Sequence, residues 1–469
     1  MDGMISIPRI AIGALKGGAG KTYISMGIVA ALKRRGMRIA VFKKGPDYID
    51  AGWLGLAAGG DCYNLDAYLF DPDTVLSSFV KRSVQADVSV IEGNRGLFDG
   101  VDSAGSYSTA ELAKMLGAPV VLVIDATKVT RTAAAFVLGC RALDPRLDLR
   151  CVILNRVGGK RHERVLREAV EGACGVPVIG AVSKLSLDSF PQRHLGLLPL
   201  HEHPKAMALV DQAAQTAEQN IDLDRLLEFI RSAGPLPVPC GADPEPVGRA
   251  DESNELRIGI LRDSAFQFYY PENIEALTNM GASIVRVSAL DPKPLPDIHA
   301  LYIGGGFPET HAERLAENVV FRESLRQAVE DGLPVYAECG GLMYLSRNLI
   351  IDHRAYPMTG TFSVDSVLSR VPQGHGYIRA EVVGSNPFYD EGTVLTGHEF
   401  HYSYVGGMDD PDVRCVLKVV RGHGIDGFRD GLCKRNALAT YVHVHALGEP
   451  RWARGIIRTA REYRWRHGS

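Results

Sequence analysis

Short apolar runs alternate with helix-like segments along the first half of the chain. The apolar runs cover residues 9–15, 38–43, 88–93, 119–126 and 151–157. Segments with helical spacing lie between them, for example at 23–35 and 109–116. Continuous apolar strands that alternate with helices are typical of a parallel sheet covered by helices on both faces. We therefore predict an α/β fold for this part of the chain.

A second domain is predicted after a break in this pattern. Residues 232–255 are rich in proline, glycine and acidic residues, which is typical of a linker. A new apolar strand follows at 256–261, and later segments, from roughly residue 357 onward, are shorter, β-like and rich in glycine. We expect a first domain at 1–231, a linker at 232–255, a second domain at 256–450 and a basic helix at 451–469.

The basic C-terminal segment has two interpretations. Trp452, Ile456 and Tyr463 could share one face of a helix and touch a membrane surface. The same apolar face could instead pack against its own domain. We favour packing.

Composition narrows the class of protein. The chain has 469 residues, 46% of them hydrophobic and 23% charged, as in ordinary globular proteins. Its net charge of -3 gives no electrostatic reason to expect a nucleic-acid partner. Eight cysteines occur without a CxxC pair, which argues against a disulfide framework or a zinc site. We find no signal-peptide pattern and no apolar run of about 18 residues, so we expect a cytoplasmic protein without membrane contact.

The sequence KGGAGKT at 16–22 indicates a phosphate-binding loop, because it follows one predicted strand and precedes a helix. Backbone N–H groups and the helix N-terminus would hold phosphate oxygens of ATP. Lys21 would reach the β- and γ-phosphates, and Thr22 would bind Mg²⁺. Leu15 replaces the first glycine of the common motif, so the match is to the deviant form with a signature lysine, Lys16. Nucleotide contacts are expected from Lys16, Gly17, Gly18, Ala19, Gly20, Lys21 and Thr22.

Four carboxylates follow predicted strands of the same domain. Asp47 and Asp50 follow the strand at 38–43. Glu92 lies at the end of the strand at 88–93, and Asp99 follows that strand. Ligands of open α/β sheets gather at the carboxyl ends of strands, and Mg²⁺ prefers oxygen ligands. We expect Thr22, Asp47 and Glu92 to bind Mg²⁺, directly or through water. Each aspartate could alternatively cap a turn.

A second kind of chemistry is indicated at 333–345, where Cys339 stands between a short strand and two glycines that open a helix. This is the pattern of a nucleophile elbow, in which a sharp turn lifts the side chain off the sheet. Buried structural cysteine is the alternative. The base could be His398, His401, His443 or His445, and the sequence pattern does not choose among them. Backbone for an oxyanion hole is expected at Gly304, Gly305, Gly306 and Gly340.

The chain resembles the cobyrinic acid a,c-diamide synthase family of glutamine-dependent amidotransferases. The resemblance runs from about residue 9 to 450 and rests on motifs that occur in the family's order: GAGKT, FKKGPDYID, EGNRGLFDG, STAELAK, LNRV, RHLGLLP, FQFYYPENIEAL, IGGGFPE, YAECGGLMYL, GHEFHYS and YVHVH. It implies a dethiobiotin-synthetase-like P-loop domain followed by a class I glutamine amidotransferase-like domain.

The resemblance also implies roles for single residues. Cys339 is implied as the glutaminase nucleophile and His443 as the histidine that activates it. The glutamine pocket is implied at the oxyanion-hole glycines named above. Triad glutaminases carry an acid two residues after that histidine; here His445 stands there, which implies a Cys–His dyad with His445 as an accessory residue. The implied catalytic acids are Asp47, Asp50, Glu92 and Asp99, with Asn155 at the nucleotide and Tyr48 at the substrate.

The implied reaction is the amidation of the a and c acetate groups of cobyrinic acid, with ATP, Mg²⁺ and glutamine. Departures from the family pattern at Lys44, Asn94 and Arg95 add positive charge near the expected substrate site, so amidation of sirohaem or (nickel-)sirohydrochlorin by the same mechanism is an alternative. A partition-type switch ATPase is a second alternative, because Lys16 could act across a homodimer. The amidotransferase half has no role in such a switch.

Overall fold

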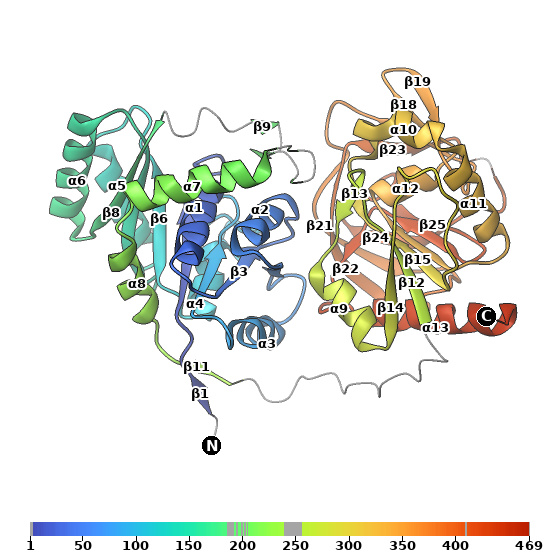
Figure 1. Ribbon diagram of the computed structural model, residues 1–469, viewed down its shortest axis with the longest axis horizontal. Coiled ribbons are helices and arrows are strands. Elements are labelled where there is room, and N and C mark those ends of the chain that lie inside the picture. Colours follow the sequence, from blue (N-terminus) through green and yellow to red (C-terminus); the bar gives the residue numbers. More distant parts are fainter. Residues whose placement is uncertain are drawn as a thin grey trace. The chain divides into compact units, whose positions relative to one another are not determined.

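The computed structural model describes residues 3–184, 192–193, 196–197, 200, 203, 205–238, 256–408 and 410–468 (Figure 1). The chain divides into two compact units, Met1–Ala242 and Asp243–Ser469, which are described separately below. Most of the RHLGLLP motif and residues 239–255 of the expected linker lie outside the described residues.

A parallel sheet forms the centre of the first unit. Among its described residues, seven strands pair in the order β4-β3-β5-β2-β6-β7-β8, and every pairing is parallel. Two short antiparallel pairs, β1–β11 and β9–β10, lie outside this sheet. The strands are β1 Met4–Ile5, β2 Arg9–Ala14, β3 Ile39–Lys44, β4 Cys62–Leu65, β5 Val88–Glu92, β6 Val120–Asp125, β7 Leu149–Val157, β8 Val178–Ser183, β9 Gln192–Arg193, β10 Gly196–Leu197 and β11 Leu236–Pro237.

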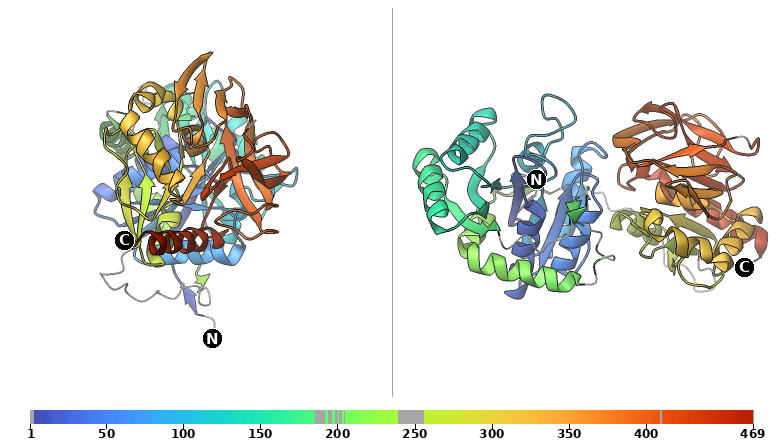
Figure 2. Two further views of the ribbon diagram at one scale, coloured as in Figure 1. Left: turned by 90° about the vertical axis from the view of Figure 1, so that its right-hand side faces the viewer. Right: turned by 90° about the horizontal axis from the view of Figure 1, so that it is seen from above.

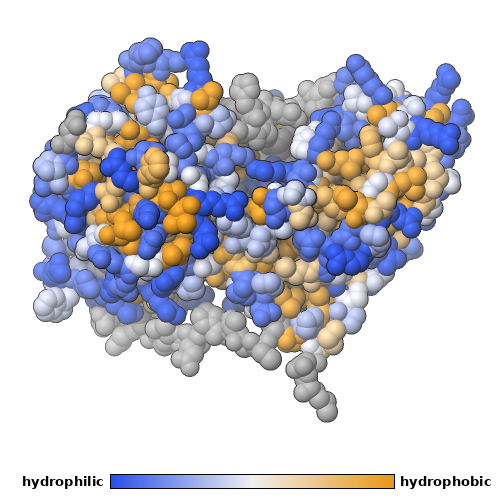
Figure 3. Space-filling view, turned by 180° about the vertical axis from the view of Figure 1, so that it is seen from behind, coloured by the Kyte–Doolittle hydropathy of each residue, from blue (hydrophilic) through white to orange (hydrophobic). Residues whose placement is uncertain are grey.

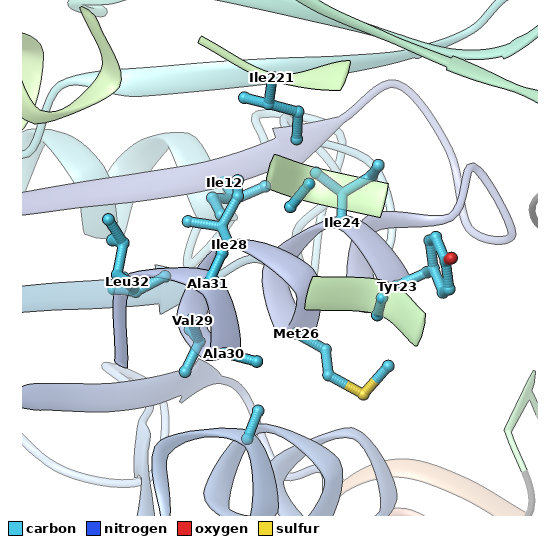
Figure 4. Close-up of a cluster of buried hydrophobic side chains, with 14 of the residues drawn as sticks. Ile12, Tyr23, Ile24, Met26, Ile28, Val29, Ala30, Ala31, Leu32 and Ile221 are labelled. Atoms are coloured by element: carbon cyan, nitrogen blue, oxygen red, sulfur yellow. The ribbon is translucent and has the colours of Figure 1, made fainter. Parts of the chain in front are cut away.

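Helices cover both faces of this sheet (Figure 2). They are α1 Lys21–Arg34, α2 Ile49–Ala58, α3 Pro72–Ser83, α4 Thr109–Met115, α5 Thr132–Leu143, α6 Lys160–Cys174, α7 Ala206–Asn220 and α8 Leu223–Arg231. Helices α1, α2, α7 and α8 share one core with the sheet, and Figure 4 shows α1 side chains such as Ile24 and Ile28 beside Ile12 of β2. Val41 of β3 joins that core, whereas its neighbour Phe42 contacts Phe79 of α3. Because successive strand residues face opposite sides, α3 lies on the other face.

The second unit is built on a mixed sheet. Among its described residues, ten strands pair in the order β14-β12-β15-β17-β26-β25-β24-β21-β22-β27. The pairings from β14 to β26 are parallel, and those from β26 to β27 are antiparallel. A smaller sheet, β19-β18-β20-β23, and a short pair, β13–β16, accompany it. The predicted change to β structure is thus confirmed, but the expected shortness is wrong, since β21, β22 and β24 have nine, eight and eight residues and are longer than the strands of this unit before residue 357.

The strands of this unit are β12 Leu256–Leu261, β13 Phe266–Phe268, β14 Ala282–Val287, β15 Ala300–Ile303, β16 Gly305–Gly306, β17 Val335–Glu338, β18 Asn348–Ile351, β19 Arg354–Pro357, β20 Asp365–Leu368, β21 Gly374–Val382, β22 Val394–His401, β23 Ser403–Gly406, β24 Arg414–Arg421, β25 Arg429–Lys434, β26 Ala437–Thr440 and β27 His443–Val444. The helices are α9 Pro271–Asn279, α10 Ala312–Glu317, α11 Val319–Glu330, α12 Gly340–Leu345 and α13 Arg451–His467, with a 3₁₀ turn at Pro308–His311.

Two cores lie on either side of this sheet. One contains side chains of α10, α11 and α12, and the other contains side chains of α9 and α13. Trp452 and Ile456 of α13 are fully buried in the second core. The apolar face of the basic helix is therefore occupied by its own unit, which confirms the packing interpretation.

The outer surface of the molecule mixes apolar and hydrophilic residues on the face shown in Figure 3. Trp465, near the end of α13, is 85% exposed. No helix among the described residues combines the length and the apolar character that crossing a membrane requires.

A buried arginine ties the first strand of the main sheet to two distant segments. Arg9 of β2 donates from Nη1 to the Ile7 carbonyl (2.9 Å), from Nη2 to the carbonyls of Gly117 (3.1 Å) and Gly234 (2.8 Å), and from Nε to Leu116. Burial lowers the pKa of Arg9 to about 10, so the guanidinium stays charged at neutral pH. It joins β2 to the ends of α4 and α8.

We expect the Arg9→Met variant to lose on the order of 3 kcal/mol in the free energy of unfolding, because buried carbonyls lose their donors. Urea unfolding curves of the whole chain measure this. Arg38→Met is the matched control, since Arg38 pairs with Asp87 on the surface and its loss should leave the unfolding midpoint nearly unchanged. Equal losses in the two variants would contradict the role given to Arg9.

Candidate active sites

The phosphate loop occupies the predicted position between β2 and α1. Gly18 and Gly20 have φ angles of 71° and 86°, a backbone region that favours glycine. A Cβ atom on Gly17 or Gly18 would meet only open space, whereas one on Gly20 would lie 2.2 Å from Nδ2 of Asn155. Asn155 also donates from Nδ2 to the Ala19 carbonyl (2.8 Å). Asn155, expected at the nucleotide, thus supports the loop directly.

The two lysines of the loop have different surroundings. Lys21 is buried and donates from Nζ to the carbonyls of Arg95 (2.6 Å) and Lys16 (3.4 Å). Burial and the charge of Lys43 lower the pKa of Lys21. Lys16 is exposed, with Nζ 3.7 Å from Oδ2 of Asp125 at the end of β6. Its acidic neighbour therefore comes from its own chain.

A buried lysine that the sequence analysis did not select lies at the centre of three predicted acids. Nζ of Lys43 is 2.6 Å from Oε1 of Glu92, 2.7 Å from Oδ2 of Asp50 and 3.7 Å from Oδ2 of Asp47. Lys43 and Glu92 are direct partners in the parallel pairing of β3 with β5. The signal that could have found Lys43 is a charged residue inside an otherwise buried strand, since such a charge needs a partner.

Burial and the repulsion between their negative charges shift the pKa values of these acids in different directions. Burial, and then the charge of Asp50, raise the pKa of Asp47 to about 7. Burial also opposes ionisation of Asp50, but the charge and hydrogen bond of Lys43 outweigh it and hold the pKa of Asp50 below its ordinary value. Burial raises the pKa of Glu92 despite Lys43. The ammonium group of Lys43 is thus the shared positive partner of three carboxylates.

Two of the expected metal donors lie together. Thr22 donates from Oγ1 to Oε1 of Glu92 (2.9 Å). The other carboxylate oxygen of Glu92, Oε2, is buried without a hydrogen-bond partner among the described groups. A buried, unpaired carboxylate oxygen beside a threonine hydroxyl is suited to a hard cation that keeps several waters, as Mg²⁺ does. The part of the chain that the structure describes contains no cluster of three or more His, Cys, Asp or Glu side chains arranged for a metal.

The remaining residues expected at this site differ in their burial and in their hydrogen-bond partners. Asp99 is exposed and accepts a hydrogen bond from the Gly96 N–H within its own loop (2.9 Å), which is the turn-capping arrangement. Asn94 accepts from the Arg95 N–H (2.9 Å), and Arg95 has a φ angle of 49°. Lys44 is buried rather than exposed. Tyr48 directly precedes α2.

Cys339 forms the predicted elbow. It follows β17, precedes α12 and has φ 48° and ψ −98°, a strained conformation for a residue with a side chain. A Cβ atom on Gly341 would lie 2.7 Å from the Ile303 carbonyl, and one on Gly340 would lie 3.0 Å from the Gly306 nitrogen. The glycines are therefore required by close backbone approach.

Cys339 is 6% exposed as a whole residue. Its pKa is raised far above the ordinary value by burial and then by the charge of Glu309, while a hydrogen bond from the Gly340 N–H opposes the shift. Of the expected oxyanion groups, Gly304 already donates its N–H to the Tyr269 hydroxyl (2.8 Å). The Gly340 N–H, by contrast, is directed at the sulfur of Cys339.

The structure brings His443 to the elbow. Its Nδ1 lies 3.4 Å from Oε2 of Glu338, the residue directly before the thiol. A Cβ atom on Gly305 would lie 2.6 Å from Cε1 and 3.4 Å from Nε2 of His443. The ring therefore lies between the strand that carries the elbow and the glycine loop expected to bind glutamine.

The other candidate bases have different partners. His398 stacks on His443, with ring centroids 4.7 Å apart. His401 stacks on Tyr441 at 3.6 Å and its Nδ1 contacts the Ser403 carbonyl. His445 lies beyond the end of β27, with Nε2 3.6 Å from Oε2 of Glu272. Among these four imidazoles, His443 is the one beside the acid at the elbow.

Comparisons with known proteins give matches for both halves of the chain. Residues 10–197 match the CobQ/CobB/MinD/ParA nucleotide binding domain, and residues 257–451 match the CobB/CobQ-like glutamine amidotransferase domain. The chain is 42% identical over 458 residues to the cobyrinate a,c-diamide synthase of Magnetococcus marinus, covering 97% of this chain and 98% of the relative. It is 39% identical over 457 residues to the enzyme of the same name from Archaeoglobus fulgidus, with the same coverage.

The chain belongs to the cobyrinate a,c-diamide synthase family. The resemblance given by the motifs is confirmed, as is the predicted fold class, a P-loop parallel-sheet domain followed by a glutamine amidotransferase-like domain. The amidotransferase match decides against a partition-type switch, because a switch ATPase needs no such domain.

The opposite pKa shifts of Asp47 and Asp50 give a prediction for stability. A raised folded-state pKa means that ionised Asp47 destabilises the fold above about pH 7, so Asp47→Asn should stabilise the chain at pH 8 by on the order of 1 kcal/mol. This gain should shrink as the pH falls through 7 toward 4. Urea unfolding of the metal-free protein between pH 5 and pH 8 measures it.

Asp50→Asn is the matched control with the opposite sign. A lowered folded-state pKa means that ionised Asp50 stabilises the fold at every pH above its unfolded-state value of about 3.9. Asp50→Asn should therefore be destabilising at pH 5, and less so at pH 8, because it also removes the charge that raises the pKa of Asp47. A stabilising effect of Asp50→Asn at pH 5 would contradict the opposite roles of the two acids beside Lys43.

The close approach of Gly305 to His443 gives a second prediction. Gly305→Ala places a Cβ atom against the imidazole and should lower the rate of glutamine hydrolysis at least tenfold, because the ring must move. Glutamate release measures this rate. Gly406→Ala, in β23 of the same unit, adds its Cβ to open space and should retain the parent rate. If Gly305→Ala also retained the parent rate, a role of His443 in the reaction would be contradicted.

Proposed function

We propose that this chain uses ATP and glutamine to amidate the a and c acetate groups of cobyrinic acid. The observation that carries the proposal is the full-length similarity to cobyrinate a,c-diamide synthases at about 40% identity. It is supported by the presence of two chemically distinct sites in one chain, a phosphate loop beside carboxylates and a thiol at a strained elbow beside an imidazole.

The proposed reaction of the second unit releases ammonia from glutamine. The sulfur of Cys339 attacks the side-chain amide carbon, and His443 takes the thiol proton and returns a proton to the leaving nitrogen. The Gly340 N–H stabilises the oxyanion that forms on the amide oxygen. Ammonia leaves, and water then cleaves the glutamyl thioester to give glutamate and the free thiol.

The proposed reaction of the first unit makes the substrate carboxylate electrophilic. The terminal phosphoryl group of ATP passes to a carboxylate oxygen to give an acyl phosphate and ADP, and ammonia then displaces phosphate to leave an amide. Lys21 and the loop N–H groups bind the phosphates. Thr22 and Glu92 would hold Mg²⁺, which supplies charge neutralisation at the phosphates when bound. Lys43 holds the acids of this site in place.

The substrate is best supported as cobyrinic acid. The alternative of sirohaem or sirohydrochlorin amidation rested on added positive charge at Lys44, Asn94 and Arg95. Lys44 is buried, and burial lowers its pKa while Asp66 opposes the shift. Its charge thus has an acidic neighbour in its own chain, which weakens the argument for a substrate with additional acids.

One experiment tests both the reaction and the substrate. Parent protein and Cys339→Ala are incubated with ATP, Mg²⁺ and either glutamine or concentrated ammonium salt, and products from cobyrinic acid, hydrogenobyrinic acid and sirohydrochlorin are compared by mass spectrometry. We expect doubly amidated cobyrinic acid from the parent with either nitrogen source. Cys339→Ala should lose glutamine use by at least 10³-fold and keep the ammonium reaction.

Two results would contradict the proposal. Loss of amidation with both glutamine and ammonium salt in the folded Cys339→Ala protein would contradict the assignment of the two reactions to separate units. Preferred amidation of sirohydrochlorin would contradict the substrate and leave the mechanism in place.

A further inference from the structure

One buried acid beside the thiol has no part in the mechanism above. Glu338, the last residue of β17, is fully buried. Its Oε1 accepts a hydrogen bond from the Val444 N–H (3.1 Å), and its Oε2 accepts one from the Tyr302 hydroxyl (3.0 Å). Oε2 also lies 3.4 Å from Nδ1 of His443. Both carboxylate oxygens therefore hold groups in or next to the proposed base.

His445 stands where triad glutaminases carry the acid that supports the histidine, but it has other partners. His445, two residues after His443, faces Glu272 at 3.6 Å and packs on the ring of Tyr270 at 4.4 Å. It belongs to a separate buried pair of an imidazole and a carboxylate. The acid nearest to His443 comes instead from the strand of the nucleophile.

A histidine that serves as a base needs a fixed ring orientation and a fixed tautomer. An acid at Nδ1 supplies both, because it favours a proton on that nitrogen and leaves Nε2 to exchange protons with the nucleophile. Such an acid also stabilises the imidazolium that forms when the thiol is deprotonated. The contact of Glu338 with Nδ1 has this arrangement.

We propose that Glu338 is a positioning residue for His443, so that Cys339, His443 and Glu338 form a functional triad in which the acid directly precedes the nucleophile in sequence. This inference rests on the proposed glutaminase activity of the second unit. It replaces the dyad expected from His445.

A merely structural Glu338 would behave differently in one measurable respect. Burial, the charge of Glu309 and, to a smaller extent, the charge of Glu338 raise the pKa of the Cys339 thiol. If Glu338 acted only as a nearby charge, its neutralisation would make the thiolate easier to form. If Glu338 acts through His443, its neutralisation weakens the imidazolium partner and makes the thiolate harder to form. The two roles predict opposite signs.

The test uses the full chain and the Glu338→Gln variant, which keeps the shape and removes the charge. Alkylation of Cys339 by iodoacetamide is followed by mass spectrometry of its peptide between pH 6 and pH 9, and glutamate release is measured without any tetrapyrrole. We expect alkylation at pH 7 to slow by about tenfold and glutamine turnover to fall by on the order of 10²-fold with little change in KM. Synthesis from ammonium salt should stay at the parent rate.

Glu272→Gln is the matched control, since it neutralises another buried glutamate that lies beside a histidine. It should leave both rates within about twofold of the parent. Alkylation in Glu338→Gln that is as fast as in the parent or faster, or an equal loss in Glu272→Gln, would overturn the proposal. Because glutamate release and alkylation need no tetrapyrrole, an error in the proposed substrate would leave this result unchanged.

A second variant keeps the test valid if glutamine at 338 unfolds the unit, which thermal unfolding would reveal. Glu338→Asp retains the charge but moves it away from the ring by one methylene. Its alkylation rate should lie between those of the parent and of an alanine variant at the same position. An aspartate variant slower than the alanine variant would also overturn the proposal, because a retained charge would then hinder rather than help.

Discussion

Parallel strand pairing is the constraint on which both chemical centres depend. In the first unit, β3 and β5 pair so that Lys43 is directly opposite Glu92. In the second, β17 and β26 pair so that Glu338 is opposite Thr440, and Cys339 follows at once. Since parallel strands end at one edge of a sheet, residues far apart in sequence meet there. A slip of one residue would turn these side chains to the other face.

Each centre holds its groups in a state that is unfavourable at rest. In the first unit, one ammonium is shared among three carboxylates, and Asp47 is the acid that resists ionisation most. In the second, Cys339 has a strained backbone and a thiol that burial keeps protonated. Violations of local rules cluster at functional sites, where surrounding structure holds them in place. Here the surrounding structure consists of the large apolar cores on the faces of each sheet.

Much of this arrangement could be predicted from the sequence, because glycines and strand ends leave local signals. The phosphate loop, the elbow at Cys339 and the helix at its C-terminal side follow from short motifs. Partners defined by pairing between distant strands leave weaker signals. Lys43 resembles its neighbour Lys44 in sequence, and only the register with β5 shows which of them faces Glu92. Asp99 follows a strand as Glu92 does, but a loop separates it from the sheet edge and its side chain caps that loop.

The contact of His443, the proposed base, with Glu338 is the clearest example of a relation that spacing along the chain does not reveal. A rule based on position points two residues beyond His443, to a side chain that is engaged with Glu272. In space, the acid at Nδ1 comes from a residue more than a hundred positions earlier. The same carboxylate holds the backbone N–H of Val444, so it fixes both the ring of His443 and the short strand that carries it. Because Glu338 is joined covalently to Cys339, a shift of β17 would move the thiol together with the carboxylate that contacts His443 and Val444.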